Sequence, residues 1–227
     1  DVEEFGADFA YTLDGDTEGE IQYENFNAAK AEFEISGVNV HPGSSKDVMV
    51  NASLVAMEIN AMLPAGETPR DTDGYEGFYH LTDMKGDVAR AVLRYIVRDH
   101  DAAKFEARKE ALQDIEKKIN QKWGRGTASL TITDQYRNMA EIISGCMHLI
   151  ENAEKACENA GVAPLILPIR GGTDGARLSF MGLPCPNLGT GGHGYHGPYE
   201  HITAEGMDAA CKVALELVKI YAEERAD

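Results

Sequence analysis

Residues 169–200 hold the side chains of this sequence that are best suited to chemistry. The stretch begins with Arg170, which is followed by two glycines and the pair Thr173-Asp174. Glycines let the backbone turn tightly, and the first turn of a helix presents amide N–H groups to an anion. Because arginine also binds carboxylates through paired hydrogen bonds, this half of the stretch predicts an anion site.

Three histidines, His193, His196 and His201, occupy the second half of the stretch in a glycine-rich loop. Glycines allow imidazoles to approach a common point without steric hindrance, and imidazole is a frequent metal ligand. The loop is therefore a candidate ligand segment. Many loops with glycine, proline and histidine simply lie in solvent, so residue type alone also leaves a plain surface loop open.

Asp14 and Asp16 form a further candidate, because they follow a short β-prone run at residues 9–13. A carboxylate at the end of a strand is well placed to bind a ligand in an open α/β sheet. The run Asp14-Gly15-Asp16 is also ordinary turn chemistry, so residue type does not separate the two interpretations.

The elements around Arg170 indicate such an open sheet. Residues 165–169 are predicted to form a buried strand that leads into the arginine turn, and residues 174–181 a short helix. Longer amphipathic helices are predicted at residues 139–160, ended by Gly161, and at residues 207–221. Ligands of open α/β sheets gather at the carboxyl ends of strands, where Arg170 is then placed.

The middle of the chain follows a different pattern. Alternating apolar residues predict strands at residues 31–40, 77–84, 88–99 and 127–133, and helical periodicity predicts helices at residues 46–63 and 102–122. This β-α-β-β-α-β order matches the ferredoxin-like arrangement, an antiparallel sheet with two helices on one face. We therefore predict an α/β fold, in which residues 27–136 form an inserted ferredoxin-like domain and residues 1–26 and 137–227 form part of an open α/β domain.

Composition narrows the partners. The 38 acidic and 21 basic residues give a formal net charge of −17, which disfavours binding to nucleic acid and to anionic lipid surfaces. No apolar run approaches the roughly 20 residues of a membrane helix. The four cysteines lack CxxC spacing, so we expect buried thiols in a reducing cytoplasm rather than a disulfide framework or a zinc knuckle.

Six runs spread over nearly the whole chain carry a family resemblance: residues 10–15, 39–43, 75–80, 168–176, 178–188 and 195–197. Their residues resemble those of the peptidase T family, bacterial tripeptidases that use two zinc ions and are related to aminoacylases and dipeptidases. The resemblance implies an aminopeptidase that releases the N-terminal residue of tripeptides by means of zinc-activated water. It implies further that this chain matches the C-terminal part of such an enzyme.

The same resemblance assigns metal ligands. It implies that Asp14, rather than Asp16, binds one zinc ion and that His196 binds the other, with His193 as the competing histidine. The remaining ligands and the glutamate general base belong to family motifs ahead of Asp1, so no catalytic residue is expected in this chain. We expect the missing N-terminal segment as a partner and the chain alone to be inactive.

The resemblance also places His41, Arg98 and Arg170 around the C-terminal carboxylate of the tripeptide, with the inserted domain acting as a lid. A cationic group at a fixed distance from the metal ions would measure the length of the peptide. The alternative is a non-catalytic ferredoxin-like module for interaction or dimerisation, and a homodimer is possible in either case. A phosphate site at residues 170–173 is less favoured, because the run lacks the lysine of a phosphate loop.

Overall fold

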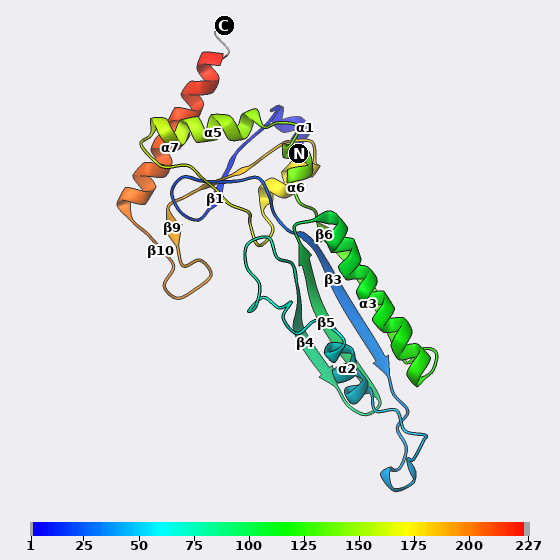
Figure 1. Ribbon diagram of the computed structural model, residues 1–227. Coiled ribbons are helices and arrows are strands. Elements are labelled where there is room, and N and C mark those ends of the chain that lie inside the picture. Colours follow the sequence, from blue (N-terminus) through cyan, green and yellow to red (C-terminus); the bar gives the residue numbers. More distant parts are fainter. Residues whose placement is uncertain (1, 225–227) are drawn as a thin grey trace. The chain divides into compact units, whose positions relative to one another are not determined.

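The computed structural model describes residues 2–224 and divides the chain into two compact units (Figure 1). One unit comprises Phe26–Tyr136, and the other combines Asp1–Asn25 with Arg137–Asp227. We call Phe26–Tyr136 the first unit and the two-segment part the second unit. The chain therefore leaves the second unit after Asn25 and re-enters it at Arg137. None of the helices within residues 2–224 combines the length and the apolar character needed to cross a bilayer.

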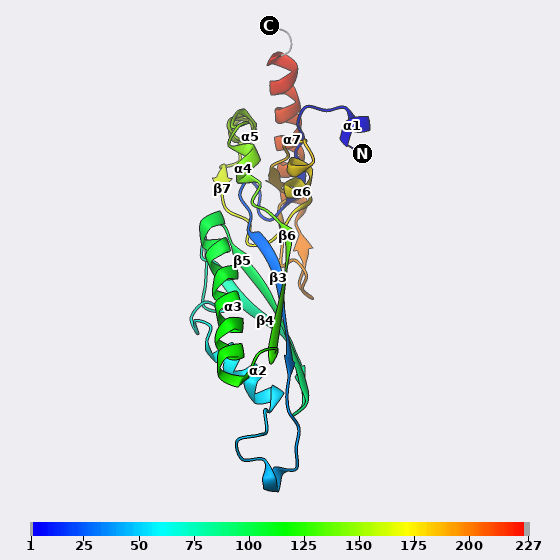
Figure 2. The ribbon, with the colours of Figure 1, turned by 90° about the vertical axis from the view of Figure 1, so that its right-hand side faces the viewer.

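The unit Phe26–Tyr136 is a four-stranded antiparallel sheet covered by two helices. Its elements are, in chain order, β3 (Asn27–Ser36), the 3-10 turn η1 (Pro42–Ser44), α2 (Ala52–Ala61), β4 (Phe78–Gly86), β5 (Arg90–Asp99), α3 (Ala102–Trp123) and β6 (Ala128–Tyr136). The strands lie in the order β4-β5-β3-β6, and α2 and α3 cover the same face (Figure 2). This arrangement confirms the predicted ferredoxin-like topology.

Alternation along the strands builds the core of this unit. Ala31, Phe33 and Ile35 of β3 are buried with Leu93 and Tyr95 of β5 beneath the helices. The predicted stripe of α3 also points into this core through Phe105, Leu112, Ile115 and Ile119. Arg90, Arg94 and Arg98 occupy the alternate positions of β5 and lie on the opposite face of the sheet.

The second unit contains a small mixed sheet in the order β1-β8-β2-β7. β1 runs parallel to β8 and β2 parallel to β7, whereas β2 and β8 are antiparallel. The core of this unit lies between the sheet and the helices α5 and α7. The elements are α1 (Val2–Phe5), β1 (Thr12–Gly15), β2 (Glu20–Gln22), α4 (Ala140–Ile143), α5 (His148–Asn159), β7 (Leu165–Ile166), α6 (Asp174–Phe180), β8 (Asn187–Gly189), β9 (Gly192–His193), β10 (His201–Ile202) and α7 (Ala204–Glu224).

Several predicted elements differ from the structure: the strands expected at residues 31–40 and 9–13 lie instead at Asn27–Ser36 and Thr12–Gly15, and three further differences have an evident cause. The single helix expected at residues 139–160 is two helices, α4 and α5, because the chain turns at Gly145 and Cys146 N–H bonds back to the carbonyl of Ile143. The helix expected from residue 46 begins only at Ala52, where the side chain of Asn51 caps it. The strand expected at residues 165–169 has only two residues, and both are exposed rather than buried.

Two asparagines join the points where the chain leaves and re-enters the second unit. The fully buried Asn25 accepts a 2.7 Å hydrogen bond from the N–H of Met139 and donates one of 3.1 Å to the carbonyl of Arg137. Asn138 in turn accepts from the N–H of Asn25 at 3.0 Å. These two connecting segments do not pair with each other as strands. The side-chain amides of Asn25 and Asn138 supply hydrogen bonds to their backbone groups instead.

Truncation of a core side chain tests the first unit. Phe33 is completely buried and packs against Tyr95, so Phe33→Ala is expected to lower the free energy of unfolding of this unit by about 3–5 kcal/mol. Trp123, the single tryptophan, packs against the same core, so its fluorescence during urea unfolding reports this unit. Met57→Ala, at a position that is 59% exposed, is the control and should change the midpoint little.

Candidate functional site

The second unit contains a polar pocket of about 310 Å³ where β1, the turn before α6 and the sheet centre meet. Among its lining residues are the acidic pair Asp14 and Asp16, together with Gln22, Arg170 and Asn187. The structure thus brings Asp14 and Arg170, which lie far apart in the sequence, to the same pocket. A pocket with both a carboxylate and a guanidinium suits a ligand that carries both charges.

The irregular pairing of β1 positions Asp14. Leu13 pairs with Leu188 and Gly15 with Gly189, and the register shifts between the two pairs, at Asp14. A bulge of this kind changes the direction of the side chain it contains and ends regular pairing. The irregularity accounts for the presence of Asp14 in the pocket rather than in the sheet.

The turn that carries Arg170 is fixed against β8. The hydroxyl of Thr173 caps α6 by accepting from the N–H of Gly175, and it donates to the side-chain oxygen of Asn187 at 2.8 Å. A Cβ at Gly175 would collide with the carbonyl of Cys185, so α6 approaches β8 this closely only because residue 175 is glycine. This contact explains the glycine at the end of the sequence run 170–175.

Negative charge is concentrated beside the pocket. Burial raises the pKa of Asp16 above its usual range, Glu20 raises it further, His193 opposes the shift, and Asp14 adds a smaller increase. Glu20 is itself buried and accepts hydrogen bonds from Thr17 at 2.6 Å and from Gln22 at 2.9 Å. A cation bound here would relieve the mutual repulsion of these carboxylates.

The three histidines of the loop are not brought to one point. His193 and His201 face each other across the short ribbon of β9 and β10, with ring centroids 5.5 Å apart. His196 lies in the connecting turn with a φ of 60°, and its side chain is exposed. The N–H of His196 donates to Glu200 at 2.9 Å, which holds the turn. Of the three, His193 influences the charge of the pocket, through Asp16.

The side chains of the described residues do not form a complete metal site. Within the part of the chain that the structure describes, no group of three or more His, Cys, Asp or Glu side chains is arranged to hold a metal ion. A catalytic zinc normally has three protein ligands. Asp14 and His196 therefore do not by themselves fit a zinc ion, and further ligands are required.

Arg98, in the other unit, has an unusual set of neighbours. Its guanidinium lies 5.1 Å from the ring centre of Tyr136, and donates to the carbonyl of Val97 at 3.1 Å and to the amide oxygen of Gln135 at 3.4 Å. Burial lowers the pKa of Arg98, and Tyr136 opposes the shift. Arg94 on the same face is instead paired with Glu32 and with Asp83.

His41 lies in the exposed turn after β3 and caps the 3-10 turn η1. Its Nδ1 accepts from the N–H of Gly43 at 3.1 Å. In the neutral ring this leaves the proton on Nε2, which is then a hydrogen-bond donor towards solvent.

Sequence reasoning did not select Glu20, Gln22 and Asn187, although all three are buried polar residues beside or within the pocket. The sequence signal for these residues was the polar-apolar-polar pattern Glu20-Ile21-Gln22. In the structure all three residues of this strand are buried. Polar side chains in such a strand are retained when they have hydrogen-bond partners.

Comparison with known proteins shows which family the middle of this chain resembles. Residues 23–127 match the family model of the peptidase dimerisation domain. The match begins just before β3 and extends through α3, so it covers most of the ferredoxin-like unit.

The whole chain also has close relatives. It is 56% identical over 224 residues to peptidase T from Clostridium perfringens, an alignment that covers 99% of this chain and 55% of that protein. Two solved structures share the fold: aminopeptidase PepT from Bacillus cereus, with a TM-score of 0.82, 23% identity and coverage of 96% of this chain and 58% of that one, and a tripeptidase from Staphylococcus aureus, with a TM-score of 0.86, 20% identity and coverage of 98% and 59%. Residues 23–127 are thus similar to a peptidase dimerisation domain, and the chain is similar to peptidase T over its whole length. It spans about half the length of the curated relatives it matches.

The charge at Asp16 gives a test by pH. Because the pKa of Asp16 is raised in the folded state from 3.8, the folded state binds more protons here than the unfolded state, and stability falls as pH rises through the folded pKa. Asp16→Asn is therefore expected to raise the melting temperature at about pH 7 in the presence of a chelator, and to bring no gain below about pH 3.

Asp87→Asn is the control of opposite sign. Hydrogen bonds from the N–H groups of Arg90 and Ala89 lower the pKa of Asp87, so this substitution should reduce stability at neutral pH. A melting temperature that Asp16→Asn leaves unchanged across the whole pH range would contradict the charge repulsion inferred here.

Proposed function

We propose that this chain is part of a tripeptide aminopeptidase, in which it supplies one wall of the active site and a lid. The observation that carries the proposal is the shared pocket of Asp14 and Arg170 in a chain that is 56% identical to peptidase T over nearly its whole length. A tripeptide is a zwitterion, and its free carboxylate suits a guanidinium in the pocket.

The proposal assigns two zinc ions to the complete enzyme. Asp14 and His196 would each supply a ligand to one of them, and the part of peptidase T with no counterpart here would supply the other ligands and the general base. The ions, when bound, supply an activated water for peptide hydrolysis. The residues of this chain bind and orient the peptide.

Binding of the peptide's C-terminal carboxylate is assigned to Arg170, Arg98 and His41. Arg98 is favoured because its hydrogen bonds in the structure are to neutral acceptors, which leaves its charge without a carboxylate partner among the described residues. His41 offers an Nε2–H donor at an exposed turn. In this proposal the unit Phe26–Tyr136 acts as a lid that brings Arg98 and His41 to the carboxylate.

The second candidate function is dimerisation, which the family match of residues 23–127 favours. In this interpretation the ferredoxin-like unit binds a second copy of itself, with or without catalysis. The two functions are compatible, because a dimerisation domain can also act as a lid.

Carboxylate recognition can be measured in an active protein. The part of the Clostridium perfringens relative that has no counterpart here would be joined ahead of this chain, and hydrolysis of a tripeptide would be compared with that of its C-terminal amide. Arg98→Met and Arg170→Met are each expected to lower kcat/KM for the free tripeptide about 10- to 100-fold, because each removes a charge-assisted hydrogen bond. Both should affect the amide much less.

Arg94→Met is the matched control, since Arg94 lies on the same face as Arg98 and is paired with Glu32. It should leave the ratio between free tripeptide and amide unchanged. A joined protein that folds and binds zinc but cleaves no tripeptide would contradict the proposed activity, whereas equal losses for both substrates would contradict the assignment of the arginines alone.

Dimerisation is tested on this chain and on residues 26–136 in parallel, by sedimentation velocity across a range of concentrations. We expect both to sediment as concentration-dependent dimers. A monomer at every concentration would rule out a self-sufficient dimerisation module.

A further inference from the structure

Three polar side chains lie buried in the sheet of the second unit. Glu20 and Gln22 of β2 are 5% and 8% exposed, and Asn187 of β8 is 1% exposed. Burying polar groups costs free energy unless they are hydrogen-bonded, and apolar side chains would fill the same space without that cost. These residues are therefore expected to fix the geometry of the groups they bind rather than to add stability.

The three side chains form a continuous series of hydrogen bonds. Gln22 donates to the carboxylate of Glu20 at 2.9 Å, and Asn187 donates to the amide oxygen of Gln22 at 3.5 Å. Gln22 and Asn187 are also directly opposite each other in the antiparallel pairing of β2 with β8, so the backbone keeps the longer of these contacts in place. We call Glu20, Gln22 and Asn187 the polar relay.

One end of the polar relay holds residues 14–17, which we call the acidic turn. The carboxylate of Glu20 accepts from the N–H of Asp16 at 3.1 Å and from the hydroxyl of Thr17 at 2.6 Å. These two residues come shortly after Asp14, which lines the pocket. The position of the acidic turn therefore depends on Glu20.

The other end of the polar relay holds residues 170–173, which we call the arginine turn. The side-chain oxygen of Asn187 accepts from the hydroxyl of Thr173 at 2.8 Å. Ahead of Arg170, the N–H of Ile169 donates to the carbonyl of Glu24 at 2.8 Å. The arginine turn is thus held on both sides, and because two flexible glycines separate Arg170 from Thr173, the contact at Thr173 limits its freedom.

The carboxylate of Glu20 gives the polar relay a direction. A carboxylate only accepts hydrogen bonds, so Gln22 turns its NH2 group towards Glu20 and its oxygen towards Asn187. Asn187 then turns its NH2 group towards Gln22, which leaves its oxygen for the hydroxyl of Thr173. The orientation at Thr173 is therefore set from the far end of the polar relay.

We propose that Glu20, Gln22 and Asn187 are positioning residues that hold the acidic turn and the arginine turn at a fixed separation. A peptide that reaches from the acidic turn to Arg170 then has one particular length, since shorter or longer peptides miss one of the two contacts. The inference rests on the proposed function and deepens it, because it names residues that set the length of the substrate without binding its carboxylate.

Hydrogen exchange in this chain tests the connection between the two turns. Gln22→Met keeps the length of the side chain but cannot donate to Glu20, so it cuts the polar relay in the middle. The reporter amides are the N–H of Asp16 for the acidic turn and the N–H of Gly175, which donates to the Thr173 hydroxyl, for the arginine turn. Relative to a core amide of α5, both should exchange about 3- to 10-fold faster, as expected for one weakened hydrogen bond.

Substitutions of Glu20 separate its hydrogen bonding from its packing. Glu20→Gln can keep an oxygen towards Gln22 and turn its NH2 group to the hydroxyl of Thr17, so both reporter amides should exchange as in the unsubstituted chain. Glu20→Met has no strong acceptor and should accelerate both, as Gln22→Met does. Packing alone does not explain such a difference between side chains of similar size.

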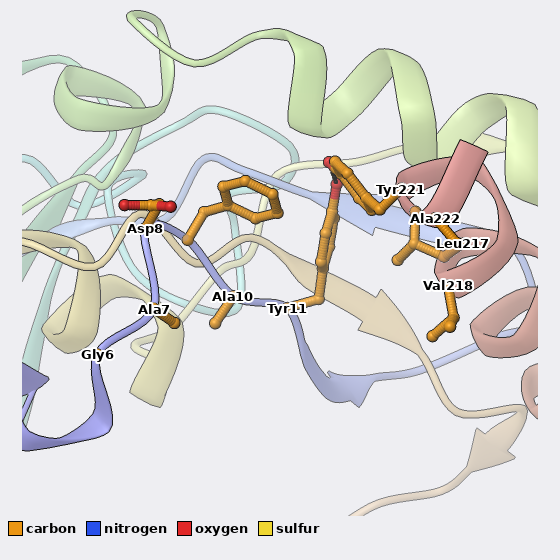
Figure 3. Close-up of a pocket in the computed structure, with 10 residues that line it drawn as sticks. Gly6, Ala7, Asp8, Ala10, Tyr11, Leu217, Val218, Tyr221 and Ala222 are labelled. Carbon is orange, nitrogen blue, oxygen red and sulfur yellow. Dashed lines mark hydrogen bonds between the residues drawn. The ribbon is translucent and has the colours of Figure 1, made fainter. Parts of the chain in front are cut away.

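Tyr11→Phe is the matched control in the same unit. The hydroxyl of Tyr11 lies 2.7 Å from that of Tyr221 and donates to the carbonyl of Leu149, beside a separate pocket (Figure 3). Its removal deletes hydrogen bonds without touching the polar relay. The exchange of both reporter amides relative to Ala156, a buried residue of α5, should stay unchanged.

Acceleration of only one reporter amide by Gln22→Met, or of neither, would overturn the proposal. Thr17→Val replaces Gln22→Met where that variant does not fold, because Thr17 is half-buried and its substitution removes a single hydroxyl at one end of the polar relay. Thr17→Val should accelerate exchange at Gly175 as well as at Asp16. An effect confined to Asp16 would equally overturn the proposal.

The effect on peptide length is measured in the joined protein, with a tripeptide and the tetrapeptide that extends it by one residue. Gln22→Met should lower the ratio of kcat/KM between the tripeptide and the tetrapeptide about 5- to 10-fold, mainly through a higher KM for the tripeptide. A purely structural role would lower kcat for both peptides equally and leave the ratio unchanged, which would contradict the selection of length. A joined protein that folds but cleaves no tripeptide would contradict the proposed activity, and the reporter amides would then decide the role of the polar relay.

Discussion

The hydrogen bonds of Asn25 hold the second unit together at the point where its two chain segments meet. Asn25 connects the end of β2 to the residues before α4 through its side chain, and it forms a parallel bridge with Ile169 through its backbone. Ile169 immediately precedes Arg170, so the position of the candidate anion-binding residue depends on this buried amide. A polar residue is required because two irregular segments meet here and neither can satisfy the other by sheet pairing.

The two units differ in how much internal packing each one has. The ferredoxin-like unit has a continuous core under two helices and is built from consecutive residues. The other unit has strands of two to four residues, an uncovered helix face and a donor set that falls short of a metal site among the described residues. Short strands contribute few pairing interactions, so this unit gains more from additional packing than the first does.

Periodicity predicted the ferredoxin-like unit well, because alternation in β3 and β5 and the stripe of α3 are set by local burial against one core. It failed where a local feature competed with the pattern. The turn at Gly145 divided an otherwise continuous apolar stripe, and Leu165 and Ile166 resembled a buried strand although they lie exposed at the sheet edge. The pairing of His193 with His201 depends on a ribbon that glycine-rich sequence does not specify.

The arrangement of charge explains how an acidic protein can bind an anionic group. The chain carries a formal net charge of −17, and on the open sheet face Arg94 is paired with the carboxylates of Glu32 and Asp83. A paired guanidinium has little remaining attraction for a ligand, whereas Arg98 is held by neutral oxygens and by Tyr136. These neutral contacts fix its position without neutralising it. Arg108 differs from Arg98 in this respect, because its guanidinium is paired with the buried carboxylate of Asp99 and is therefore structural.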